Sequence, residues 1–175
     1  MKKILLILLT VGILVPGSAL AQSYPVDRGG VILGGSASLI STDTGSNFTD
    51  ERTTTLAINP SAQFFVIPNL ALGGTAGFFL SRFDDETDAA ALLGPTLSYY
   101  VGGPDQRFYP FVSGSLQFDV EEFDDSATLL LEGGGAYMVA RNVALTGSLS
   151  FFGLLDDLGD QNIVGLRFGV SAFLF

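Results

Sequence analysis

The sequence predicts an all-β protein, an eight-stranded antiparallel up-and-down transmembrane β-barrel, within its 175 residues. Apolar residues alternate with small polar residues along most of the apolar stretches, and this period of two is typical of strands. The stretches number eight, and an even number is typical of closed membrane barrels. Short turn signals and acidic clusters alternate between successive stretches. This alternation predicts a barrel whose two ends differ in charge.

Residues 1–21 have the pattern of a secretory signal peptide, with cleavage expected after Ala21. Two lysines are followed by an apolar run over residues 4–15 and then by the small-residue sequence Ala-Leu-Ala, the three regions of such a leader. The apolar run is too short for a comfortable membrane span of ~20 residues. The leader predicts export, and residues 22–175 then form one barrel domain.

Eight stretches follow the leader, each about as long as the 9–11 residues of a tilted membrane-spanning strand, or a little longer. Three intervals between them are short turn signals, at Pro68-Asn69, 102–106 and 140–142. After the leader, no segment reaches the ~18 uninterrupted apolar residues of a membrane helix. The stretches cover residues 29–40, 53–67, 70–83, 90–101, 108–120, 126–139, 143–154 and 162–175.

The second stretch illustrates the two faces of these strands. Leu56, Ile58 and Phe64 share one face, whereas Asn59 and Gln63 share the other. Most other stretches repeat this contrast, and their polar faces carry Ser, Thr and Gly with few charges. A soluble sandwich would show charged residues on its second face. The pattern therefore favours a barrel in lipid, whose closure also removes unpaired strand edges.

The charges are concentrated between the strands. The chain carries 8 Lys and Arg against 18 Asp and Glu, and losing the two lysines of the leader changes its formal charge from −10 to −12. This balance argues against a nucleic-acid partner, which needs a basic surface. Four clusters hold 14 of the 18 acids: Asp43, Asp50 and Glu51; Asp84, Asp85, Glu86 and Asp88; Glu121, Glu122, Asp124 and Asp125; Asp156, Asp157 and Asp160.

The second and third clusters are weak candidate sites for divalent cations at the surface. Carboxylate oxygens suit Ca²⁺ and Mg²⁺, which would bridge these acids to anionic lipid headgroups, and acidic loops are also candidates for binding an extracellular ligand. Neither cluster contains the D-x-[DN]-x-[DN]-G pattern of a tight calcium loop. The interpretation that we favour is that the carboxylates keep the loops hydrated.

The composition argues against an enzyme. The chain contains no His and no Cys, which removes Ser-His and Cys-His nucleophilic sites and the usual zinc ligands. Acid pairs such as Asp84-Asp85 remain, and we interpret them as solvated loop tips. We predict no catalytic residue, no cofactor and no metal site beyond the weak surface candidates.

Alternation places a small polar network in the lumen. Asp119, Glu132 and Arg167 are expected to point inward from the fifth, sixth and eighth strands, and buried charges persist only when they are paired. We predict that Arg167 bridges Glu132 at mid-depth, with Asp119 or Gln117 nearby. An eight-stranded barrel is just wide enough for side chains to fill it, so the network is expected to plug the lumen.

Three features of the sequence carry a resemblance to a known family: YPFVSGSLQF in the fifth stretch, LEGGGAYMVARNVALTGSLSFF across the sixth and seventh, and the final Phe175. The chain resembles the small eight-stranded outer-membrane barrels of bacteria, the OmpA/OmpX-like or "outer membrane protein beta-barrel domain" family. The resemblance covers nearly all of residues 23–175. It implies that both termini and the short turns lie in the periplasm and the acidic clusters lie outside the cell.

The resemblance also implies that Phe173 and Phe175 form the signal read by the barrel-assembly machinery. Both are out of phase with Leu166 and Phe168, and a bulge near Ser171-Ala172 would reconcile the two phases, so the register of the last strand stays open here. Outer-membrane lipids are the implied partners, and aromatic girdles are expected at both interfaces. The predicted periplasmic girdle is Tyr99, Tyr100, Phe108, Tyr109, Tyr137, Phe173 and Phe175; the outer one is Phe78, Phe79, Phe83, Phe118, Phe123, Phe151 and Phe152.

Three functions are open at this point. The first is an integral outer-membrane protein of a Gram-negative bacterium with a structural or surface-interaction role, reached by Sec-type export through the periplasm. The second is a narrow porin-like channel for small solutes. The third is a soluble periplasmic barrel of the lipocalin type that binds a ligand. We favour the first, because alternation without exposed charge fits a barrel in lipid.

Overall fold

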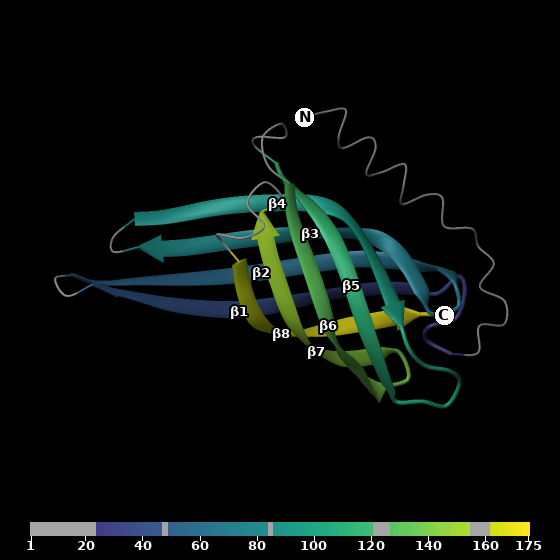
Figure 1. Ribbon diagram of the computed structural model, residues 1–175. Helices are drawn as coiled ribbons and strands as arrows, with labels where there is room; N and C mark the ends of the chain where they lie inside the picture. Colours follow the sequence, from purple (N-terminus) through teal and green to yellow (C-terminus); the bar gives the residue numbers. More distant parts are fainter. Residues whose placement is uncertain (1–23, 47–48, 84–85, 121–126, 155–161) are drawn as a thin grey trace.

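The computed structural model describes residues 24–46, 49–83, 86–120, 127–154 and 162–175, and the predicted signal peptide lies outside them. Eight antiparallel strands follow in chain order around a closed barrel, with β1 paired to β8 (Figure 1). This confirms the predicted eight-stranded up-and-down barrel. No helix in the described ranges is long and apolar enough to cross a bilayer. The strands are β1 (Val31–Ser46), β2 (Thr49–Ile67), β3 (Leu70–Phe83), β4 (Glu86–Tyr100), β5 (Phe108–Asp119), β6 (Ala127–Ala140), β7 (Val143–Leu154) and β8 (Asn162–Leu174).

The strands place apolar side chains outside and polar side chains inside. On β2, Ile58 and Phe64 are each 48% exposed, whereas Asn59 and Gln63 are buried. A water-soluble barrel has the opposite distribution, because burial of apolar surface drives its folding. The exposed apolar side chains include Leu33, Leu72, Leu97, Val112, Leu116, Leu131, Leu145, Leu149, Leu166, Phe168 and Val170.

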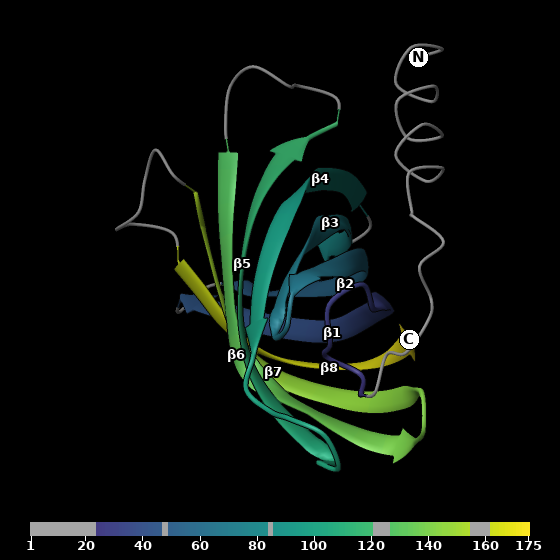
Figure 2. The ribbon, with the colours of Figure 1, turned by 90° about the vertical axis from the view of Figure 1, so that its right-hand side faces the viewer.

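The barrel is narrow and its strands are strongly tilted. Strands on opposite walls cross at a steep angle, as β5 and β6 do relative to β1 and β2 in Figure 2. Where β4 packs against β5, a Cβ on Gly94 would overlap the carbonyl oxygen of Leu116. Only glycine fits at such a close backbone approach. Eight strands enclose a lumen that side chains can fill.

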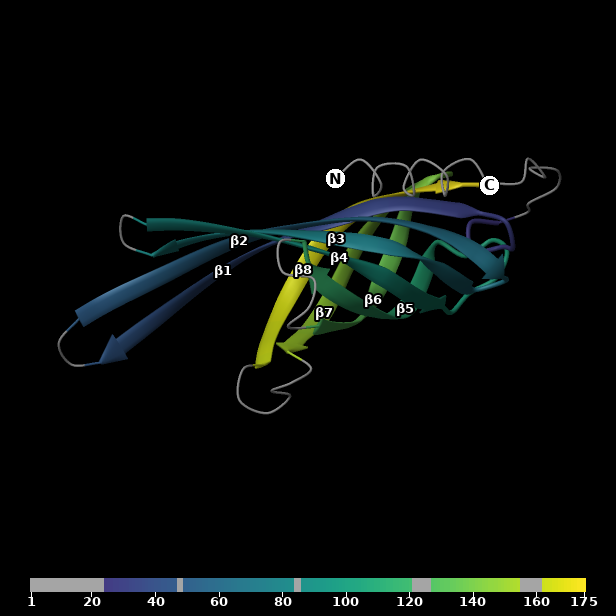
Figure 3. The ribbon, with the colours of Figure 1, turned by 90° about the horizontal axis from the view of Figure 1, so that it is seen from above.

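β1 to β4 project beyond the closed part of the barrel. The register of β1 with β8 stops at Ala37, whereas its register with β2 continues to Ser46. β4 likewise pairs with β5 from Leu92 onward but with β3 from Glu86. Figure 3 shows the β1–β2 and β3–β4 pairs extending past the ends of β7 and β8. Within the described ranges, the projecting parts of β1 and β4 each have one unpaired edge.

The register of the last strand is regular, with no bulge at Ser171-Ala172. Successive residues of β8 pair with successive residues of both β1 and β7 through this point. Phe173 points inward and is buried, and Leu174 takes the outward position. The two phases differ because the terminal aromatics lie on the inward face of a regular strand, opposite the face of Leu166 and Phe168.

One end of the barrel carries the connections 68–69, 101–107 and 141–142 together with the end of β8, and we call it the turn end. The segment before β1 closes this end. Val26 is fully buried there, and its carbonyl oxygen accepts a 2.8 Å hydrogen bond from Asn69 N. Asn69 has a φ of 70°, a left-handed conformation that Asn tolerates in tight turns.

Candidate functional site

The lumen is the candidate site, and its layer at the turn end is an aromatic plug. The ring centre of Tyr100 lies 5.6 Å from that of Phe65, 5.4 Å from that of Phe111 and 6.3 Å from that of Phe173. The rings meet tilted or edge to face, the arrangements that aromatic pairs prefer. Tyr109, which is fully buried, belongs to the same cluster. The plug occupies the lumen at this end with apolar side chains.

This plug corrects the predicted periplasmic girdle. Tyr100, Tyr109 and Phe173 are buried in the interior, whereas Tyr99 and Tyr137 are about half exposed and face outward. Side chains alternate along a strand, so neighbouring aromatics such as Tyr99 and Tyr100 must face opposite sides. Of the predicted girdle, Tyr99, Phe108 and Tyr137 remain at the outer surface.

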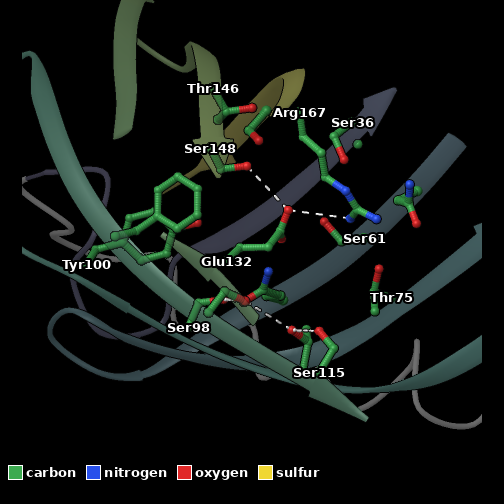
Figure 4. Close-up of a pocket in the computed structure, with 17 residues that line it drawn as sticks. Ser36, Ser61, Thr75, Ser98, Tyr100, Ser115, Glu132, Thr146, Ser148 and Arg167 are labelled. Atoms are coloured by element: carbon green, nitrogen blue, oxygen red, sulfur yellow. Dashed lines mark hydrogen bonds and ion pairs between the residues drawn. The ribbon is translucent and has the colours of Figure 1, made fainter. Parts of the chain in front are cut away.

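The middle layer of the lumen contains an ion pair between β6 and β8 (Figure 4). Arg167 Nη1 donates to Glu132 Oε1 over 3.4 Å, and Ser148 Oγ donates to the same oxygen over 3.3 Å. Arg167 is 5% exposed and Glu132 is 19% exposed. The pairing expected from alternation is therefore present, and it neutralises a guanidinium that is almost wholly removed from solvent.

Hydroxyl groups fill the rest of this layer. Ser115 Oγ donates to Thr96 Oγ1 over 2.6 Å, and Ser98 Oγ donates to Ser113 Oγ over 2.9 Å. The space between the side chains is a polar cavity of about 60 Å³. A water molecule needs ~10–15 Å³ by this kind of measure. The cavity therefore has room for a few waters and for no larger solute.

Asp119 and Gln117 lie farther from the ion pair than predicted. Glu132 is opposite Ser113 in the β5–β6 register, and Asp119 is roughly 20 Å farther along β5 at ~3.3 Å per residue. Gln117 is about 13 Å along by the same measure. Gln117 is fully buried, and its amide has no hydrogen-bond partner among the described residues. The Glu132–Arg167 ion pair therefore lies at a different depth in the lumen from both Asp119 and Gln117.

The layer toward the opposite end contains a second aromatic contact. Phe79 and Phe152 project into the lumen, with ring centres 5.6 Å apart. Phe78 faces outward and is 51% exposed. The predicted outer girdle is therefore divided between the two sides of the wall. Phe123 and the side chain of Phe83 lie outside the described part of the chain.

The candidate cation sites lie mostly outside the described residues. Asp84 and Asp85 fall there, as does the whole cluster of Glu121, Glu122, Asp124 and Asp125. Glu86 and Asp88 belong to β4, where Asp88 is exposed. In the ranges that the structure describes, no three acidic side chains gather closely enough to hold a metal ion.

The sequence analysis missed a charged pocket at the turn end. Asp105, Arg107 and Arg141 line it together with Phe175, and its volume is about 400 Å³. The Arg141 guanidinium carbon lies 5.9 Å from the ring centre of Phe175. A signal was available, because Asp105, Arg107 and Arg141 all belong to or adjoin the turn signals while most acids lie at the other intervals.

Comparisons with known proteins support the fold and extend no further. No family model matches the chain, and no curated protein matches it. Among solved structures, it is similar to one described as "De novo design of transmembrane beta-barrels", with a TM-score of 0.51 and 16% identity over 85% of this chain and 98% of that one. At that identity the likeness shows a shared β-barrel fold alone.

Proposed function

We propose that this protein is an integral outer-membrane β-barrel of the small OmpA/OmpX-like family, with a structural or surface-interaction role. The observation that carries the proposal is the distribution of side chains: Leu, Val and Phe cover the outside, while Ser, Thr and an ion pair line the inside. Exposed apolar surface costs ~25 cal/mol per Å² in water and is solvated by hydrocarbon in a bilayer. A soluble lipocalin-like barrel needs the reverse arrangement, with an apolar lumen.

Electrophoresis of the membrane fraction with and without boiling tests this proposal. We expect the folded barrel to require detergent for extraction and to migrate differently before and after heating, because a closed barrel resists unfolding in the cold sample. A chain that is released in buffer alone, and that migrates identically in both samples, contradicts membrane insertion and favours the soluble barrel.

We expect the wild-type protein not to conduct ions when it is reconstituted in a planar bilayer. The polar middle layer favours a narrow channel as the second candidate, but its cavity of about 60 Å³ lies between the Tyr100 plug and the Phe79–Phe152 contact. A side-chain-filled lumen of eight strands leaves no continuous water path. Steady single-channel currents through the wild-type barrel would favour the channel instead.

The projecting parts of β1 and β4 support a surface-interaction role. Their unpaired edges present backbone N–H and C=O groups beyond the closed barrel, and such edges can accept an extended strand from a partner. The acidic residues of the neighbouring intervals would keep these edges hydrated and select against acidic partners. The absence of His and Cys from the sequence supports a role without catalysis.

Export and assembly complete the proposal. The leader at 1–21 would direct Sec-type export, and the last strand with Phe173 and Phe175 would engage the barrel-assembly machinery. The turn end would then lie in the periplasm and the projecting strands at the cell surface. The closed part of the barrel would contact outer-membrane lipids on all sides.

A further inference from the structure

We propose that the pocket at the turn end binds the headgroup of a zwitterionic phospholipid of the phosphatidylethanolamine type. Arg107 and Arg141 would hold the phosphate, and the Asp105 carboxylate would accept hydrogen bonds from the ammonium group. The proposal rests on the membrane location proposed above, because that location puts this rim at the level of the headgroups.

The pocket combines the three charges with apolar walls. Its volume of about 400 Å³ lies within the ~300–1,000 Å³ of small-molecule sites. Val139, which is 52% exposed on the outer wall, lines it together with the inward-facing Tyr109 and Met138. The pocket therefore extends from the lipid-facing surface to the rim of the lumen, where a headgroup and the first carbons of its chains can lie together.

The backbone that carries Asp105 and Arg107 is braced before any ligand arrives. Tyr109 OH donates to Gly103 O and Gly103 N donates to Gln106 Oε1, each over 3.2 Å. Arg107 O accepts a 2.7 Å hydrogen bond from Met138 N, which ties this turn to β6. Asp105 has a φ of 68°, and this left-handed conformation favours Asn and Asp among non-glycine residues. A braced turn lowers the entropy lost on binding.

Arg141 approaches the same pocket from the β6–β7 turn. Its guanidinium carbon lies 5.9 Å from the ring centre of Phe175, within the range of a cation–π contact. The adjacent residue, Asn142, accepts a 2.8 Å hydrogen bond from Phe173 N through its carbonyl oxygen. Two turns and the end of β8 thus converge, and guanidinium groups are the side chains best suited to phosphate.

The charges favour one headgroup chemistry. Two guanidinium groups beside one side-chain carboxylate match a phosphate joined to an ammonium that carries N–H donors. A choline headgroup has no N–H to donate to Asp105. A glycerol headgroup has no positive charge. Its phosphate would therefore be repelled by the Asp105 carboxylate, with no ammonium group between them.

The test is native mass spectrometry of the full-length folded protein in detergent, titrated with short-chain phosphatidylethanolamine, phosphatidylcholine and phosphatidylglycerol. We expect the first lipid to bind about tenfold more tightly than the other two, since a charge-assisted hydrogen bond is worth at least a factor of ten. Glycerophosphoethanolamine, which has no acyl chains, is expected to bind more weakly than the lipid. The proposal is overturned if the three lipids bind equally tightly. It is also overturned if glycerophosphoethanolamine binds as tightly as phosphatidylethanolamine.

Variants assign the binding to this pocket. We expect R107A/R141A to lose about tenfold in affinity for all three lipids, and Asp105→Asn to lose the preference for ethanolamine while keeping phosphate binding. Arg28→Ala removes a cation at the same end that does not line the pocket, and it is expected to bind as the wild type does. Unchanged binding by R107A/R141A overturns the proposal.

The gel shift on heating is recorded for each sample. A wild-type barrel that keeps its shift but shows no lipid preference counts against this site alone, whereas a missing shift in the wild type counts against the barrel in the membrane.

Discussion

A Glu132→Ala variant is expected to lose about 3–5 kcal/mol of unfolding free energy, because it leaves a buried charge without its partner. Arg167 is 5% exposed, and Glu132 Oε1 is its charged acceptor at 3.4 Å. The neighbouring hydroxyl groups cannot supply a negative charge. The measurement is the midpoint of heat or denaturant unfolding of the purified barrel, followed by the electrophoretic shift.

Two further variants make this result specific to the ion pair. The double variant Glu132→Ala/Arg167→Ala is expected to be more stable than Glu132→Ala alone, because no unpaired charge remains in the lumen. Asp88→Ala removes an exposed carboxylate on β4 and is expected to stay within about 0.5 kcal/mol of the wild type. Full heat resistance of the Glu132→Ala barrel would show that the pairing contributes nothing.

A Phe173→Ala variant is expected to lose about 3–5 kcal/mol, the usual effect of deleting a buried aromatic ring and leaving a cavity. The ring of Phe173 is 1% exposed and lies 6.3 Å from that of Tyr100 in the plug. Its removal also opens the turn end of the lumen toward the polar middle layer. We therefore expect a lower unfolding midpoint, whereas the Phe79–Phe152 contact keeps the lumen closed to ions in a planar bilayer.

Phe168→Ala is the matched control, since Phe168 belongs to the same strand but is 68% exposed on the outer wall. In detergent micelles that ring meets detergent in both the folded and the denatured state, so its loss is expected to change stability by about 1 kcal/mol at most. No conductance is expected. Equal destabilisation of the two variants would contradict the assignment of Phe173 to an interior plug.

The sequence by itself determined the number of strands, most of their limits and, along most strands, which side chains face outward. The predicted stretches 70–83 and 143–154 coincide with β3 and β7. These features are local, because a period of two assigns each residue to one side of its own strand. The stretch 29–40 underestimates β1, which continues to Ser46. The projecting part lies beyond the closed barrel, and its sequence lacks the alternation that a lipid-facing wall imposes.

Only the tertiary structure decided which inward side chains meet. Glu132 and Arg167 are 35 residues apart in the chain, and the closed register brings them together. The same register puts Asp119 near the opposite end of β5 and gathers the turns at 101–107 and 141–142 around one pocket. Alternation specifies the side of the wall on which a residue stands. Its depth depends on the register between strands, which is set by non-local pairing.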